Sequence, residues 1–110
     1  MTKGIIITFN ISPKEVPRKG IVNLHRKLYG YKDHSQHGKY EYHRPGLLDE
    51  IPHLNPNRSV IITFKKDALK VINLLKNYTN QIFTREVLLT KKDLESMMST
   101  ENINSTEAKP

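Results

Sequence analysis

Histidine, tyrosine and basic side chains are concentrated in one short interval of the chain, residues 29 to 44. Aromatic rings stack on unpaired bases and neighbouring cations pair with phosphates, so this mixture favours a single-stranded nucleic acid. The alternative is structural, with the tyrosines packing across a strand pair and the charges forming a solvated rim. Nothing in the interval encodes recognition of a particular base, and both RNA and DNA stay open as partners.

The charge of the whole chain favours the same kind of partner. Its 110 residues include 18 Lys and Arg against 11 Asp and Glu, a net charge of +7. Much of the excess lies between residues 14 and 44, and such a basic field attracts polyanions. A basic surface that serves only solubility is the competing explanation. The predicted nucleic-acid-binding residues are Lys14, Arg18, Lys19, Arg26, Lys27, Tyr31, Lys32, His34, His37, Lys39, Tyr40, Tyr42, His43 and Arg44.

The same interval contains residue types that suit two more specific functions, metal binding and cleavage of RNA. His34, His37 and His43 are potential zinc ligands, but zinc needs three or four ligands and the chain has no cysteine, so we predict no metal and no cofactor. Two histidines with a lysine or tyrosine can also cleave RNA without a metal ion. A metal-independent ribonuclease using the cluster from His34 to Arg44 is therefore an alternative. The leading prediction is a binding protein that is not an enzyme.

Two similar halves of the sequence position these residues. The apolar stretches at 5–9 and 60–64 both end in Ile-Thr-Phe, and helical patterns follow from Pro17 to Tyr29 and from Lys66 to Tyr78. The other predicted elements are a loop over 31–38, an edge strand over 39–44, a helical turn within 47–54, a turn at 55–57, and a strand over 81–89 with a short helix after it.

A repeated strand–helix–strand unit with right-handed crossovers predicts a ferredoxin-like βαββαβ sandwich. This α+β fold has a four-stranded antiparallel sheet with two helices on one face, and its first and third strands are the inner pair. We predict a single α+β domain over residues 1–98, with pseudo-repeats at about 4–45 and 59–89 from an internal βαβ duplication. The polar segment 99–110 predicts a disordered C-terminal tail.

The sheet face without helices is the second candidate surface. Period-two alternation predicts that Val60, Ile62 and Phe64 point inward, matching Ile5, Ile7 and Phe9. The open face would then carry Ile6, Thr8, Asn10, Ile61, Thr63 and Lys65. Exposed isoleucine on a sheet indicates a partner lying over it, and a second copy of the chain, a C-terminal helix and nucleic acid are the three candidates. We predict a homodimer. The alternative function, from another class, is a protein-interaction, assembly or inhibitor module that uses this open face.

The longest apolar runs, such as Ile5-Ile6-Ile7, are far shorter than a membrane span. No basic and then apolar leader opens the chain. We therefore expect a cytoplasmic protein without a membrane partner.

The sequence FNIS at the end of the first strand, with a basic helix ending in KLYG, resembles the start of a family of small CRISPR-associated proteins. The resemblance covers roughly twenty residues. It implies a ferredoxin-like dimer that holds duplex DNA. That family's strand ends in a carboxylate able to bind a metal, whereas the matching position here is Asn10, so the resemblance implies binding of a nucleic acid without cutting it.

Overall fold

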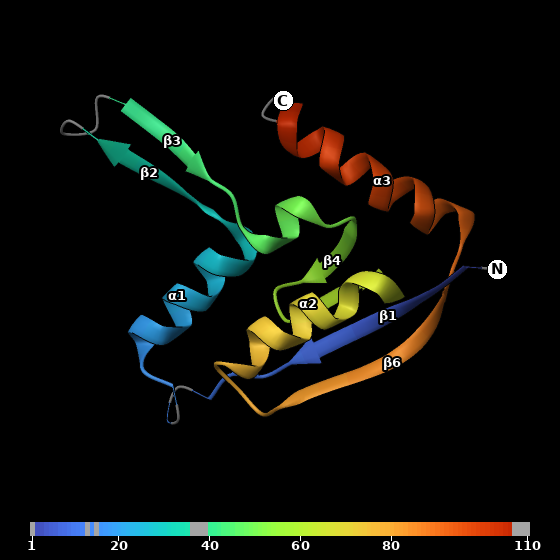
Figure 1. Cartoon of the computed structure of the whole chain (residues 1–110), viewed down its shortest axis with the longest axis horizontal. Coiled ribbons are helices and arrows are strands. Elements are labelled where there is room, and N and C mark those ends of the chain that lie inside the picture. The colour runs from blue at the N-terminus through green and yellow to red at the C-terminus, as the bar shows by residue number, and fades with distance from the viewer. Residues whose placement is uncertain (1, 13, 15, 36–39, 107–110) are drawn as a thin grey trace.

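A four-stranded antiparallel sheet in the order β4–β5–β1–β6 forms the body of the protein (Figure 1). The computed structural model describes residues 2–12, 14, 16–35 and 40–106, and the described chain is of the predicted α+β class. In chain order its elements are β1 (Thr2–Phe9), α1 (Arg18–Tyr29), β2 (Tyr31–Ser35), β3 (Tyr40–Arg44), the 3-10 turn η1 (Leu47–Glu50), β4 (His53–Asn57), β5 (Val60–Phe64), α2 (Lys65–Lys76), β6 (Ile82–Leu89) and α3 (Lys91–Thr106).

The two most apolar strands, β1 and β5, lie side by side at the centre of the sheet. In their antiparallel register Ile7 lies opposite Ile61, and Ile5 lies opposite Thr63. β6 pairs along the other side of β1, from Thr2 to Phe9. The prediction that the first and third predicted strands are the inner pair is confirmed.

The helices α1 and α2 cover the same face of this sheet. Their apolar stripes have the predicted helical spacing and meet alternate residues of β1 and β5 in one buried cluster. Its members are Ile7, Phe9, Leu24, Leu28, Leu48, Ile51, Ile61, Ala68, Val71 and Leu75. The cluster fixes the position of α1, which carries part of the candidate site.

The predicted facing of β5 is wrong by one residue. Ile61 and Thr63 are buried, whereas Val60, Ile62 and Phe64 were expected to point inward. Side chains paired directly across two strands lie on the same face, and pairing with Ile7 therefore turns Ile61 toward the helices. The two halves share the sequence Ile-Thr-Phe, but the corresponding side chains point to opposite faces of the sheet.

The predicted edge strand over 39–44 is not part of the four-stranded sheet. β3 pairs with β2 in a separate two-stranded hairpin, and β4 occupies the sheet edge beside β5. The segment 31–35 was predicted as a loop, and 55–57 as a turn. All five side chains of β3 are exposed, so this strand has no apolar face to place over the core. β4 has such an anchor, because Ile51 just before it and His53 at its start are buried.

Two glycines hold the hairpin against the end of α1. Gly30 follows the helix with φ of 77°, a conformation that favours glycine, and its N–H donates to the carbonyl of Arg26. A Cβ at Gly30 would lie 2.4 Å from the carbonyl oxygen of Arg44. A Cβ at Gly46 would lie 2.3 Å from the nitrogen of Gly30. The two backbones can approach this closely only because neither residue has a side chain.

The helix α3 begins with a reciprocal cap. The N–H of Thr90 donates to Asp93 Oδ2 at 2.9 Å, and the N–H of Asp93 donates to Thr90 Oγ1 at 3.0 Å. The helix extends to Thr106, past the predicted start of the tail at residue 99, and a disordered tail stays a prediction. In the described part of the chain no helix is long and apolar enough to cross a membrane. The expected cytoplasmic location also stays a prediction.

Candidate nucleic-acid interface

The hairpin β2–β3 projects from the end of α1 and presents two faces of different chemistry (Figure 1). Tyr31 pairs with Arg44 and Asp33 with Tyr42 on what we call the aromatic face, which also holds the Arg44–Asp33 ion pair. The opposite face is charged and pairs Lys32 with His43 and His34 with Glu41. Tyr42 is 50% exposed, so its ring is accessible to a ligand.

Carboxylates already pair with the described cations of the hairpin. Arg44 Nε lies 3.1 Å from Asp33 Oδ2. On the charged face, Lys32 Nζ and His34 Nε2 each lie 3.8 Å from the carboxylate of Glu41. His43 Nε2 lies 3.3 Å from Asp49 Oδ2, on the neighbouring 3-10 turn. The local positive charge of the hairpin is therefore smaller than its content of basic residues suggests.

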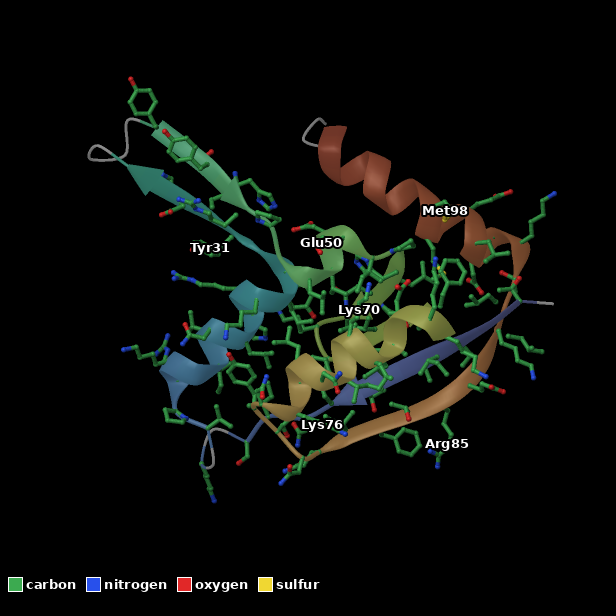
Figure 2. All side chains as sticks on the ribbon, viewed as in Figure 1. Tyr31, Glu50, Lys70, Lys76, Arg85 and Met98 are labelled. Atoms are coloured by element: carbon green, nitrogen blue, oxygen red, sulfur yellow. The ribbon has the colours of Figure 1, made fainter. Side chains whose placement is uncertain are left out.

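Arg26 joins α1 to the aromatic face of the hairpin. Its guanidinium carbon lies 4.5 Å from the ring centroid of Tyr31, in a cation–π contact. Figure 2 shows Tyr31 between α1 and the hairpin. Lys27, the next residue, instead has its ammonium 5.7 Å from the ring of Tyr78, after α2. The two neighbouring cations of α1 therefore belong to different surfaces.

A cavity of about 380 Å³ lies between α1 and the segment from β4 to β5. Its lining includes the cations Arg26 and Arg58. Neither guanidinium has a carboxylate within 4.0 Å among the described residues. The other lining residues are Val22, His25, Tyr29, Gly30 and Asn55. Among the described residues no acidic one belongs to this lining, which distinguishes the cavity from the hairpin.

Two polar side chains of the cavity, Tyr29 and Asn55, are held in place by hydrogen bonds. The hydroxyl of Tyr29 donates to the carbonyl oxygen of Arg58 at 2.6 Å. Asn55 Nδ2 donates to the carbonyl oxygens of Asn57 at 2.7 Å and Val60 at 2.8 Å. These bonds tie the chain around Arg58 to α1 and to the sheet, so the cavity wall is built by three parts of the fold.

Two titratable groups of the cavity are perturbed. Burial, together with the nearby Arg58 guanidinium, lowers the pKa of His25. Burial raises the pKa of Tyr29, although hydrogen bonding to Asn55 and the charge of Arg58 act in the opposite direction. The rings of His25 and Tyr29 lie 5.9 Å apart at 40° to one another. Near neutral pH the cavity thus combines an uncharged imidazole with two guanidinium cations.

The structure separates the described residues of the predicted set into three groups, apart from Lys27, which contacts Tyr78. Arg26 and Tyr31 meet at the junction of α1 and the hairpin, and the exposed Lys14, Arg18 and Lys19 lie at or before the start of α1. The hairpin carries Lys32, His34, Tyr40, Tyr42, His43 and Arg44. His37 and Lys39 lie outside the described residues.

Arg58, His25, Tyr29 and Asn55 were absent from the predicted set. The histidine and the tyrosine lie in the helical pattern of α1, on the side that α1 turns toward the cavity. A close approach of Arg58 to this helix is a tertiary contact, and no spacing in the sequence indicates it.

Within the described part of the chain, no group of three His, Asp or Glu side chains could hold a metal ion. His34 and His43 each lie near a different carboxylate, Glu41 and Asp49 respectively. His37 is outside the described residues, so the three histidines cannot be compared as one set.

The fold is that of a small α+β domain with a four-stranded antiparallel sheet and a projecting hairpin. No protein-family model, curated protein or solved structure matches this chain. The similarity to small CRISPR-associated proteins stays a resemblance of roughly twenty residues.

Proposed function

We propose that this protein binds single-stranded nucleic acid along the surface that joins the cavity of α1 to the aromatic face of the hairpin, without cutting it. One observation carries the proposal: Arg26 lines the cavity and also stacks on Tyr31. A strand crossing this junction meets cations without carboxylate partners first, and then exposed aromatic rings. Backbone neutralisation and stacking of bases are the two interactions that sequence-tolerant binding requires.

The cations contribute unequally in this proposal. Arg26 and Arg58 have no carboxylate partner among the described residues, so a phosphate does not compete with one for them. Arg44 and Lys32 already have Asp33 and Glu41 beside them, and a phosphate must compete with those carboxylates. We therefore expect the hairpin to contribute mainly through its tyrosines.

Fluorescence anisotropy with labelled single- and double-stranded RNA and DNA, at about 50 and 200 mM salt, tests the proposal. We expect tighter binding of single strands, with log K falling by about 0.7 per phosphate contact for each unit of log salt. Arg26→Gln should weaken binding about tenfold, whereas the control Lys76→Gln, on the exposed side of α2, should not.

The same samples on a denaturing gel distinguish binding from cleavage. Intact probes support a binding protein. Absence of binding at low salt would overturn the proposal. Degradation that His34→Gln or His43→Gln abolishes would instead support the metal-independent ribonuclease.

We also infer a ferredoxin-like βαββαβ topology for the sheet. In this interpretation β4 takes the place predicted for the segment 39–44, and the hairpin β2–β3 is an insertion between α1 and β4. The placement of β1 and β5 between β4 and β6 supports it. Nuclear Overhauser contacts between Leu54 and Ile62, which are paired in this register, provide the test. Contacts of β5 with β3 in place of β4 would contradict it.

A homodimer formed through the open face of the sheet is the second part of the proposal. Ile6 pairs with Ile62 on this face, and Phe83, 51% exposed, pairs with Thr8. Among the described residues that β1, β5 and β6 place on this face, Arg85 is the only charged one. Its guanidinium carbon lies 4.0 Å from the ring centroid of Phe83. A second copy suits this face because the basic charge of the protein lies elsewhere, and burying apolar area drives association.

Sedimentation velocity at micromolar concentration tests the dimer. The wild type should sediment as a dimer and Ile62→Glu as a monomer, because the new carboxylate would be buried in the contact. The matched control Leu69→Glu, at an exposed position of α2 on the other face, should stay dimeric. A monomeric wild type would overturn the homodimer, and the open face would then be assigned to a different protein partner.

A further inference from the structure

The cavity beside α1 has the chemistry of an anion site. Arg26 and Arg58 supply two guanidinium groups to its lining, and the other lining residues are neutral or apolar near pH 7. The carboxylate of Asp49 comes close to Gly30, since a Cβ there would lie 3.1 Å from its Oδ2. That same Oδ2 accepts the N–H of Gly46 at 2.7 Å, and His43 lies 3.3 Å from it.

The remaining walls of the cavity suit a planar, partly apolar group. Val22 is 41% exposed, and the rings of His25 and Tyr29 lie beside it in the lining. Tyr29 is fixed by its hydrogen bond to the backbone of Arg58, so its ring is already in place before a ligand arrives. Aromatic rings of this kind stack on nucleobases.

The size of the cavity restricts the ligand further. Its volume of about 380 Å³ lies at the lower end of the range for small-molecule sites. One nucleotide is a suitable occupant, whereas a folded RNA element or a protein segment is not.

We propose that this cavity binds a single phosphorylated nucleotide, with the phosphate between Arg26 and Arg58 and the base against His25 and Tyr29. The ligand is either a free nucleoside monophosphate or the phosphorylated end of a strand. In the second case the inference rests on the proposed function, because the strand then continues from the cavity past Arg26 onto the hairpin. Bidentate pairing of guanidinium with phosphate supplies most of the affinity.

Isothermal titration with AMP, adenosine and inorganic phosphate tests the cavity without any strand. AMP should bind at least about tenfold more tightly than adenosine, because a charge-assisted phosphate contact is lost in adenosine. Arg58→Gln should weaken AMP binding by a similar factor of about ten. The substitution leaves the backbone carbonyl that accepts from Tyr29, so the fold is preserved. Lys76→Gln on α2, outside the cavity lining and the open sheet face, is the control and should bind AMP as the wild type does.

A proton NMR titration of His25 gives a second, independent measurement. Its neighbours in the cavity are Arg26, Arg58 and the neutral Tyr29. A phosphate dianion placed between the two arginines offsets their charge, so the pKa of His25 should rise when AMP binds. An unchanged pKa with saturating AMP would contradict the proposed position of the phosphate.

Short RNA strands with a 5′-phosphate, a 3′-phosphate or neither distinguish the two sources of the ligand. A phosphorylated end should increase the affinity of the wild type but not of Arg58→Gln. AMP binding without strand binding would leave the cavity site standing and overturn the proposed function. Strand binding with no AMP binding and no effect of end phosphates would overturn the cavity site alone. Equal AMP affinities of Arg58→Gln and Lys76→Gln would also overturn it.

Discussion

The cations of the hairpin and those of the cavity differ in what surrounds them. Arg44 and Lys32 each have a carboxylate on a neighbouring strand, at 3.1 and 3.8 Å. Arg26 and Arg58 have none among the described residues, and they line a cavity with no acidic side chain. Both groups count equally in the net charge, but only the cavity cations lack a competing carboxylate among the described residues.

The difference shows how basic residues can serve two purposes in one small domain. Cross-strand ion pairs on an exposed hairpin contribute roughly 1 kcal/mol or less each to stability, and they mainly fix the register of the strands. Cations held apart from carboxylates keep their charge available for binding. We therefore expect a structural role for the charges of the hairpin and a binding role for those of the cavity.

The largest expected effect comes from disturbing the close contact of Gly30 and Gly46, which holds the hairpin against the end of α1. Gly46→Ala places a Cβ against the backbone of Gly30 and Leu28, so we expect the free energy of unfolding to fall by about 3 kcal/mol. Urea denaturation followed by circular dichroism measures the change. Gly20→Ala within α1 is the control, because its Cβ meets only a side-chain methyl of Val16 and its effect should stay within about 1 kcal/mol. Equal stability of both variants would show that the glycine junction is not required.

The next effect concerns the tyrosines of the hairpin. Tyr42→Ala removes an exposed ring and should weaken the binding of a single-stranded RNA about tenfold, the cost of losing one stacked base. Tyr42→Phe keeps the ring and should bind as the wild type does. Anisotropy titrations compare the two variants. An equal loss in both would point to a hydrogen bond of the hydroxyl in place of stacking.

A smaller effect is expected when a carboxylate of the hairpin is removed. Asp33→Asn releases Arg44 from its ion pair, and we expect affinity for single strands to rise about threefold at low salt. Arg44→Gln should change the affinity by less than about twofold, because that guanidinium is already paired. A large loss of affinity in Arg44→Gln would contradict the distinction between the two groups of cations.

The smallest effect is the pH dependence contributed by His25. Its pKa is lowered in the folded protein, so the unfolded chain binds more protons as pH falls through the ordinary histidine value of about 6.5. The free energy of unfolding should therefore decrease as pH falls through that range. His25→Gln should remove this part of the decrease. Thermal unfolding at several pH values compares the two proteins, and identical pH profiles would contradict a perturbed His25.

Several elements were predictable because their signals are local. Pro17 before α1 and Gly30 after it mark the ends of the helix, and the apolar runs of β1 and β5 indicate the centre of the sheet. The exchange of β3 for β4 at the sheet edge was not predictable in this way. The segment 39–44 has the alternation of a strand, whereas β4 contains Asn55-Pro56-Asn57, a turn signal, and β4 takes the edge because a buried anchor such as Ile51 adjoins it.

The candidate site shows the same division. The interleaved tyrosines and cations of the hairpin were visible as a pattern, but their pairing with Asp33, Glu41 and Asp49 was not. Arg58 was not predicted because its place in the cavity depends on α1, a helix more than twenty residues earlier in the chain.

The sequence by itself determined the α+β class, the helix α1 between its proline and glycine, the two central strands and the excess of positive charge. Those features follow from side-chain periodicity and backbone preferences, which act over a few neighbouring residues. The tertiary structure decided which strand closes the sheet, which face of β5 is buried, and which cations lack a carboxylate. These depend on contacts between distant segments, because strand register and charge pairing are set only when such segments pack together.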